Sequence, residues 1–485
     1  MKHFLLFLFL MCEAGSVRAE ADSPPTVVTV NPGERRQTFD GMGCGTIFYS
    51  GHITSFRQRE KHALQEQFYD DLFTAVRTEY LHVMIRPDFE PKNDNEDPYH
   101  AEFSEDAFAA NLPALEVCAA ARKRRPKMQL FATLYTPPKW MKTNSEESGG
   151  GQQKGALKPG CELELCEYVW SYLRHMSQNG NPVGFLSICN EADWPHDQPS
   201  YFLMPEEHAR LFGIFVDYLD EMARRFPQVP KPKLVAPNML SAVDTALKYW
   251  PAMLPDEVNR VDVLGAHDYD RRGHRWKDLR HLAGSRPLWC TEWCWNGPDA
   301  SPDLIKAASE YWLVMTEAFN DGANVWMAYD WAYPPRQGGE ALTHVQWGQS
   351  YHKTKIYYGF RQWCNSLRPG MRVVDVMLTG PDATGISTPG VKATAFVDND
   401  QGRLVAHVVN VQDRHVAIRL RIPDPAYSDC AVEVVRTSVD DSDKPYPPQR
   451  LGEDGLSDTL KPREMVTYIL ERHRQPGELQ NASDP

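Results

Sequence analysis

The feature that most constrains the fold is an alternation of apolar strand patterns and amphipathic helical patterns, which begins at Gly41 and repeats eight times. Apolar runs of strand length are followed by segments in which apolar residues recur every three or four positions. This alternation is typical of parallel sheets whose strands are connected by helices. Strands are expected at residues 42–48, 80–86, 129–134, 184–189, 233–236, 261–266, 287–291 and 323–329.

Helical patterns lie between and after these strands. The clearest span residues 57–76, 105–124, 162–178, 205–226 and 302–321, and weaker ones span 241–249, 275–283 and 351–366. Eight strands with eight helices predict an α/β fold, a (β/α)8 TIM barrel over residues 41–366. A doubly wound open sheet is the alternative, but no glycine-rich nucleotide turn follows the first strand and opens a helix.

The pattern changes after Arg368-Pro369-Gly370, where helical periodicity stops. Strands are expected in quick succession at 372–378, 391–397, 403–411, 415–422, 431–437 and 465–470. These predict a smaller β-sandwich domain over residues 367–472. Residues 26–30 also resemble a strand, which a turn at residues 31–33 should end, and the polar residues 473–485 are expected to form a disordered tail.

The N-terminus and the overall charge indicate where the protein acts. Residues 1–19 contain one lysine, an apolar core and small residues near Ala19, which predicts a cleavable signal peptide and a secreted or periplasmic protein. No other segment is apolar enough for a membrane anchor. The formal net charge is −13 and basic residues form no block, which argues against nucleic acid as a partner.

The cysteines do not indicate a metal site. None of the ten cysteines belongs to a C-x-x-C pair, and the histidines form no cluster with ligand spacing, so we expect no metal and no cofactor. Cys161 and Cys166 are close enough in sequence for a local disulfide. Small buried thiols are expected at Cys44, Cys189, Cys290 and Cys294.

Two of the expected barrel strands end in glutamate. One apolar run ends in Asn190-Glu191, and another ends in Glu292. A carboxylate at the end of a buried strand is costly unless it has a function or a partner. The C-terminal ends of barrel strands meet at one face, where active sites form. Two carboxylates among aromatic residues, with no nucleotide motif, are typical of enzymes that hydrolyse glycosidic bonds.

Six segments then carry a family resemblance. In chain order they are QTFDGMG (37–43), PPKWMKTN (137–144), SICNEADW (187–194), AHDY (266–269), LWCTEW (288–293) and YYGFRQWCNSLRPGMRVV (357–374). Together they resemble glycoside hydrolase family 30, in the clan of (β/α)8-barrel retaining β-glycosidases. The resemblance implies that residues 26–40 join the side β-sandwich.

The resemblance also implies residue roles. Glu191 would be the general acid/base and Glu292 the nucleophile of a retaining mechanism. Asn190 would bind the sugar 2-hydroxyl, and Tyr269 would hydrogen-bond Glu292. The other substrate-site residues would be Arg86, which stabilises the charge of Glu292 from below, the sugar platforms Tyr135 and Trp331, and His267, which orients a neighbour.

The expected activity is therefore hydrolysis of a β-linked oligo- or polysaccharide, of xylan or β-glucan type, by a monomer. A glucosylceramidase-like exo-enzyme, an inverting hydrolase and a non-catalytic glycan-binding barrel are the alternatives. Ala192 stands where the family usually has proline, and the segment at Tyr135 also departs from the family pattern. These departures leave the sugar and the linkage open.

Overall fold

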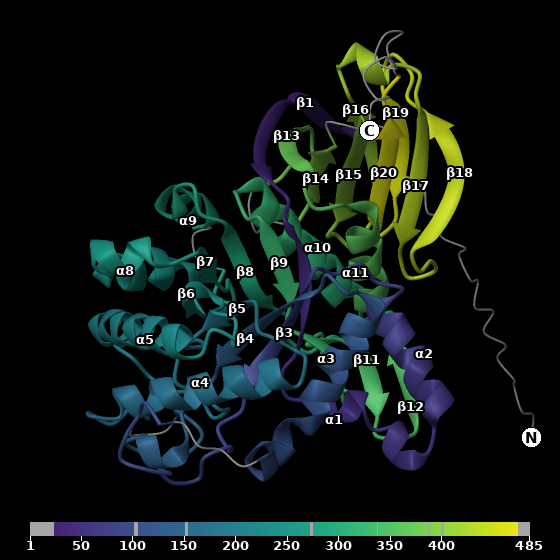
Figure 1. Cartoon of the computed structure of the whole chain (residues 1–485). Helices are drawn as coiled ribbons and strands as arrows, with labels where there is room; N and C mark the ends of the chain where they lie inside the picture. The colour runs from purple at the N-terminus through teal and green to yellow at the C-terminus, as the bar shows by residue number, and fades with distance from the viewer. Residues whose placement is uncertain are drawn as a thin grey trace, which may run out of the picture.

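The computed structural model describes residues 24–100, 105–150, 154–271, 275–336, 338–385, 389–398 and 402–473. The expected signal peptide and nearly all of the expected C-terminal tail lie outside these ranges. Figure 1 shows two domains, a barrel wrapped by helices and a β-sandwich beside it. The expected TIM barrel with a smaller side β-sandwich is confirmed.

Eight parallel strands close the barrel in chain order, and the first strand pairs with the last, with Gly41 beside Val325. Large side chains, among them Phe131 and Trp289, fill its interior near the starts of the strands. This packing leaves the C-terminal ends of the strands as the open face. The barrel strands are β2 (Gly41–Thr46), β3 (Tyr80–Ile85), β4 (Gln129–Leu134), β5 (Phe185–Ser187), β6 (Lys233–Met239), β7 (Val263–Ala266), β8 (Leu288–Trp293) and β9 (Val325–Ala328).

The outer helices follow from their sequence signals. The helix α5 begins at Pro205, carries Glu206 and Glu207 in its first turn and ends with two arginines, which suits the helix dipole. The longer helices are α2 (His62–Phe73), α3 (Leu112–Arg124), α4 (Glu162–Gln178), α5 (Pro205–Arg225), α9 (Trp276–Ala283), α10 (Ile305–Asn320) and α11 (Lys355–Ser366). Shorter helical segments are α1 (Ser50–Ile53), η1 (Arg57–Arg59), η2 (Glu105–Asn111), η3 (Lys139–Met141), α6 (Ala242–Asp244), η4 (Thr245–Tyr249), α7 (Trp250–Ala252), α8 (Pro255–Asn259), η5 (Pro302–Leu304) and η6 (Pro425–Tyr427).

A small three-stranded sheet between β9 and α11 was not expected. It consists of β10 (Asp330–Tyr333), β11 (Ala341–Gln346) and β12 (Ser350–Lys353). The helix predicted to begin at residue 351 therefore begins only at Lys355, after the Thr354 hydroxyl accepts a hydrogen bond from the Ile356 amide. This sheet lies beside α1 in Figure 1.

The sandwich strands form one hydrogen-bonded order, β18-β17-β20-β15-β14-β13-β1-β16-β19. The prediction of a turn at residues 31–33 is wrong, because β1 continues to Thr38. The pairing of β1 with β13 changes register twice after Asn31, as at a β-bulge, and the strand is not interrupted. The sandwich strands are β1 (Thr26–Thr38), β13 (Arg372–Thr379), β14 (Val391–Val397), β15 (Arg403–Asn410), β16 (Val416–Arg421), β17 (Ala431–Thr437), β18 (Lys444–Arg450), β19 (Leu456–Leu460) and β20 (Met465–Glu471).

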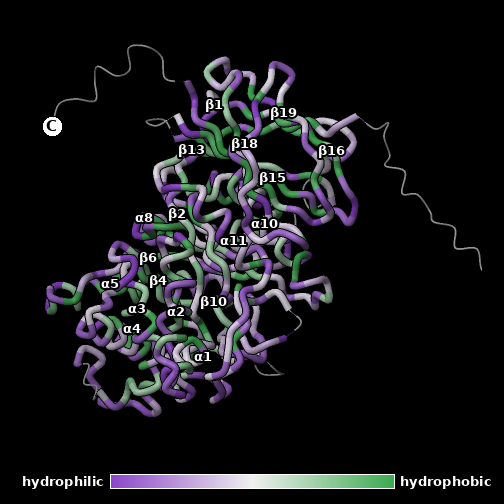
Figure 2. The backbone as a smooth tube through the Cα atoms, turned by 90° about the vertical axis from the view of Figure 1, so that its right-hand side faces the viewer, coloured by the Kyte–Doolittle hydropathy of each residue, from purple (hydrophilic) through white to green (hydrophobic). Residues whose placement is uncertain are grey.

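The two domains share an apolar interface. The helices α10 and α11 pack against each other and against sandwich strands, and they lie between the domains in Figure 1. Rings from both sides meet there, at Phe39, Phe319, Trp363, Phe396 and His407. In Figure 2 the hydrophobic residues are concentrated in the interior of both domains, and the loops at the periphery are mostly hydrophilic.

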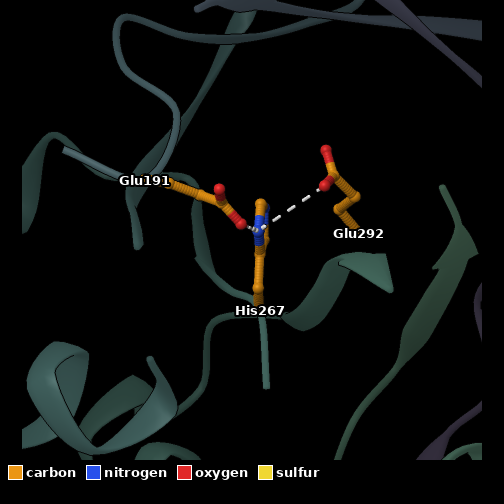
Figure 3. A group of neighbouring side chains, drawn as sticks. All are labelled: Glu191, His267 and Glu292. Atoms are coloured by element: carbon orange, nitrogen blue, oxygen red, sulfur yellow. Dashed lines mark hydrogen bonds and ion pairs between the residues drawn. The ribbon is translucent and has the colours of Figure 1, made fainter. Parts of the chain in front are cut away.

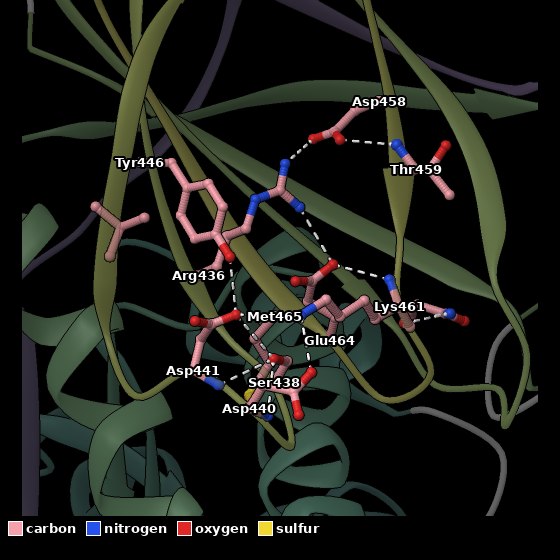
Figure 4. A network of polar contacts seen from close by, with 12 residues as sticks. Arg436, Ser438, Asp440, Asp441, Tyr446, Asp458, Thr459, Lys461, Glu464 and Met465 are labelled. Carbon is pink, nitrogen blue, oxygen red and sulfur yellow. Dashed lines mark hydrogen bonds and ion pairs between the residues drawn. The ribbon is translucent and has the colours of Figure 1, made fainter.

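A buried network of charged side chains connects β17 with β19 and with the start of β20 (Figure 4). Arg436 of β17 is 6% exposed, and its guanidinium pairs with Asp458 and with Glu464, the latter at 3.2 Å. The ring of Tyr446 lies 5.2 Å from that guanidinium. Since both carboxylates have a cationic partner, their burial is compensated.

The nine cysteines in the described ranges are all free, so the disulfide suggested between Cys161 and Cys166 is absent. Cys161 lies just before α4, whereas Cys166 points into the core from its second turn. The four thiols expected to be buried core residues are confirmed as such. None of the helices in the described ranges combines the length and the apolar character needed to cross a membrane.

Candidate active site

The two glutamates predicted from the strand ends meet at the open face of the barrel. Glu191 follows β5 and Glu292 is the penultimate residue of β8, and they are 6% and 4% exposed. One oxygen of each carboxyl group and one ring nitrogen of His267 all lie within 4.8 Å of one another. Figure 3 shows the His267 ring between the two carboxyl groups.

Irregular backbone places both glutamates. Glu191 has a φ of +49°, in the left-handed region that is rare for such a residue. Asn238, at the end of β6, holds this geometry, because its carbonyl accepts from the Glu191 amide and its side-chain Nδ2 donates to the Cys189 carbonyl. The register of β8 against β9 also shifts between Cys290 and Trp293, and this irregularity directs the Glu292 side chain toward the open face of the barrel.

Two tyrosine hydroxyls hold Glu292. Tyr269 donates to Oε1 at 3.0 Å, which is the contact expected from the resemblance. Tyr135 donates to Oε2 at 2.5 Å, a contact that its expected role as sugar platform did not include. Both hydrogen bonds favour the ionised carboxylate, because an anion is the better acceptor.

Two histidines approach Glu191 instead. Nδ1 of His267 lies 2.8 Å from Oε1, and Nε2 of His196 lies 3.8 Å from Oε2. His267 is fully buried and has its pKa lowered by burial, so a neutral imidazole faces this carboxyl group. His196 was not predicted, because nothing in a single sequence indicates that the loop after Trp194 folds back over Glu191.

The two carboxyl groups differ in proton affinity. Burial alone raises the pKa of Glu191 to about 8. Burial also raises the pKa of Glu292, to about 7, while the hydrogen bonds from the two tyrosine hydroxyls oppose the rise. In the singly protonated pair the proton therefore resides on Glu191 and the charge on Glu292.

A cavity of about 910 Å³ opens above the pair. Asn190 lines it, and its Oδ1 is a buried oxygen with no hydrogen-bond partner among the described residues. The other lining residues are Phe48, Tyr49, Tyr135, Glu191, Trp194, His196, Asp197, Gln198, Leu240, Tyr269, Asp270, Glu292, Cys294, Asn296, Tyr329, Tyr333, Arg336 and Glu340.

Two predicted site residues lie elsewhere. The guanidinium of Arg86 pairs with Asp88 at 2.7 Å, its side chain is 36% exposed and it does not line the cavity, so the expected support for Glu292 is absent. Trp331 is fully buried and packs edge-on against Phe73 and Phe360, so its ring has no face for a sugar. His267 does not line the cavity, and its Nδ1 lies 2.8 Å from Oε1 of Glu191 and 4.0 Å from Oε1 of Glu292.

Glu191, His267 and Glu292 are also the only set in the described ranges with three potential metal-ligand atoms so close together. Their atoms are already engaged, because His267 Nδ1 bonds Glu191 and both oxygens of Glu292 accept from tyrosine hydroxyls. This arrangement suits proton transfer and nucleophilic attack better than metal coordination.

Solved structures share this architecture over nearly the whole chain. The family 30 subfamily 8 xylanase Xyn30A from Clostridium acetobutylicum superposes with a TM-score of 0.65 and 19% identity, covering 92% of this chain and 99% of that one. The chain has the fold of the family 30 glycoside hydrolases. The endo-beta1,6-glucanase BT3312 gives a TM-score of 0.64 and 16% identity, covering 92% and 94%.

Sequence comparison adds a relative that matches over only part of its length. The Caenorhabditis elegans protein "Putative glucosylceramidase 1" is 23% identical over 173 residues, which are 34% of this chain and only 32% of that protein's length. No family model matches the chain. The likeness to family 30 enzymes therefore lies in the fold more than in the sequence.

Proposed function

We propose that the protein is a retaining β-glycosidase that hydrolyses a β-linked glycan by double displacement. The observation that carries the proposal is the closeness of the two carboxyl groups, whose nearest oxygens lie within 4.8 Å. Retaining glycosidases hold these groups about 5–5.5 Å apart so that one attacks directly, whereas inverting enzymes need about 6.5–9.5 Å for an intervening water.

In the first step, the ionised Glu292 attacks the anomeric carbon while Glu191 gives its proton to the departing glycosidic oxygen. A covalent glycosyl–enzyme ester forms and the aglycone leaves as an alcohol. The raised pKa of Glu191, about 8, keeps the required proton near neutral pH. Asn190 lines the cavity beside Glu191 and would bind the sugar 2-hydroxyl.

In the second step, esterification has removed the charge of Glu292, so Glu191 can act as base. It takes a proton from water, whose oxygen attacks the anomeric carbon and releases Glu292 with net retention of configuration. The hydroxyls of Tyr135 and Tyr269 stabilise the carboxylate as it leaves.

The substrate we propose is a xylan- or β-glucan-type chain, since a xylanase and a β-1,6-glucanase share the fold. A glucosylceramide-like β-glucoside is the second candidate, supported by the sequence similarity to the Caenorhabditis elegans protein. We also propose that the protein is exported, from the signal-like pattern of its first 19 residues.

Substitution of each of the two glutamates by glutamine tests the proposal. Glu292→Gln should lower turnover of an aryl β-glycoside by at least about 10⁴-fold, because no nucleophile remains. Glu191→Gln should keep more activity on a substrate with an acidic phenol leaving group than on one with an alcohol leaving group, because the phenolate needs no proton to leave. Proton NMR of the first product should show the β-anomer; an α-anomer would establish inversion, and full activity of Glu292→Gln would disprove the nucleophile.

A further inference from the structure

A row of aromatic rings leads from the catalytic cavity to the protein surface. Tyr329 and Tyr333 line the cavity and their ring centroids lie 5.9 Å apart. Tyr49 lies 4.2 Å from Tyr333, His52 lies 5.0 Å from Tyr49, and Trp347 lies 4.8 Å from His52. We call these five residues the aromatic track.

The track becomes more exposed as it leaves the cavity. Tyr329 and Tyr333 are each 8% exposed, Tyr49 and His52 are half-buried, and Trp347 is 40% exposed. A single exposed apolar side chain needs no explanation by itself, but Trp347 continues a row of ring contacts that begins at the cavity. Its continuity with the cavity suggests that Trp347 serves the same ligand.

The structure holds Trp347 in place. It lies at the tip of the β11–β12 hairpin, next to Gly348, whose φ of +61° allows the tight turn. The Gly348 amide donates to the Ser55 hydroxyl at 2.8 Å, and that hydroxyl donates to the His52 carbonyl at 2.6 Å. The hairpin tip is therefore tied to α1, and the tryptophan is presented with little entropy left to lose on binding.

The chemistry of the track fits sugar rings. Tyrosine and tryptophan combine a flat apolar face with a polar edge, which suits the C–H faces and hydroxyls of pyranose rings. An alkyl chain would need aliphatic walls, and Leu240 is the single aliphatic side chain among the residues that line the cavity.

We propose that the aromatic track is an extended binding site for a β-linked oligosaccharide and that Trp347 is its outer stacking platform. This inference rests on the proposed glycosidase function and deepens it, since it makes the substrate a chain of several sugars. Sugar units bound along the track would add affinity that a single glycoside cannot use.

The test compares substrate length in the full-length protein. Steady-state kinetics are measured on an aryl β-monoglycoside, on an alkyl β-monoglycoside and on β-linked oligosaccharides of two to six units, for the wild type, Trp347→Ala, Trp347→Phe and Trp347→Leu. The wild-type kcat/KM should rise with length. In Trp347→Ala the kcat/KM for the longest substrates should fall about tenfold, through a higher KM. Its kcat/KM for the aryl glycoside should equal that of the wild type. Leu112→Ala, also at an exposed apolar residue, is the matched control.

The Phe and Leu variants separate stacking from simple apolarity. Trp347→Phe should recover most of the lost affinity, and Trp347→Leu should not. Equal kinetics of wild type and Trp347→Ala at every length would overturn the inference, as would a loss confined to alkyl glycosides that Leu restores, which would indicate a lipid. Inactivity of the wild type on all glycosides would instead disprove the proposed function.

Discussion

At the scale of single residues, two glutamates of almost equal burial are distinguished by what surrounds them. Two hydroxyls donate to Glu292, while a neutral imidazole faces Glu191. Because donors to an anion lower its pKa, the environment keeps the charge on Glu292 and the proton on Glu191. The proposed division of labour between acid and nucleophile therefore depends on Tyr135 and Tyr269.

Removing one donor should shift the pH profile. In Tyr135→Phe the pKa of Glu292 should rise, because its shortest hydrogen bond is lost. Glu292 must be ionised to attack, so the acidic limb of kcat/KM against pH should move up by about one unit, with about a ten- to hundredfold loss at the optimum. The measurement is a pH–rate profile on an aryl β-glycoside.

Tyr329→Phe is the control for this profile, because its hydroxyl accepts from Tyr333 and the residue lines the same cavity. The acidic limb of that variant should stay in place. An acidic limb of Tyr135→Phe that coincides with the wild type would show that Tyr135 does not set the charge of Glu292.

Sequence patterns predict such residues unevenly. Both glutamates, Asn190 and Tyr269 could be placed because they stand at strand ends that must converge. Trp331 could not, since the direction of a ring beyond the last strand depends on how the chain turns, and here it faces Phe73 and Phe360. Arg86 leaves the site because Asp88, two residues away, offers a carboxylate at 2.7 Å.

At the scale of elements, the acidic loop after β3 packs against acidic residues of α4. Glu167 is fully buried and Glu90 is 3% exposed. Burial is the main cause that raises the pKa of Glu167 to about 9, and the charges of Asp94, Glu164 and Glu90 add to it. Burial likewise raises the pKa of Glu90 to about 8. The contact between loop and helix thus depends on carboxyl groups that hold protons.

This contact should weaken as pH rises. Between the ordinary glutamate value of 4.5 and about 9, the folded protein keeps a proton on Glu167 that the unfolded chain releases, so stability falls across this window. Glu167→Gln removes that loss. Its free energy of unfolding should exceed that of the wild type by about 1–3 kcal/mol at pH 8 and by little at pH 4.5. Urea unfolding at both pH values measures the difference.

The exposed Glu433 of β17 supplies the comparison, since Glu433→Gln should change stability equally at both pH values. A Glu167→Gln variant that is less stable than the wild type at pH 8 would contradict the prediction. It would mean that the ionised carboxylate has a stabilising partner.

Elements were predictable where apolar periodicity was strong. The bounds of α4, β4, β14 and β17 agree with the pattern. The strand β18 was missed because it contains three prolines, which an edge strand tolerates since one side of it forms no ladder. The sheet β10-β11-β12 was missed because its strands are short, of only four or six residues each.

At the scale of the whole molecule, the chain enters and leaves the barrel through the sandwich. The strand β1 pairs with β13 and β16 before β2 opens the barrel, and α11 returns the chain to β13. The ring cluster of Phe39, Phe319, Trp363, Phe396 and His407 takes residues from both domains. Neither domain can expose this face without a large loss of buried apolar area.

The two domains should therefore unfold together. Phe396 of β14 is fully buried, and Phe396→Ala leaves a cavity between α10 and the sandwich, with an expected loss of about 3–5 kcal/mol. Calorimetry should show one transition, and the midpoint for loss of the proposed glycosidase activity should fall in parallel with that for hydrogen exchange of the sandwich strands. Two transitions, with activity lost at the wild-type temperature, would show that the barrel folds independently of the sandwich.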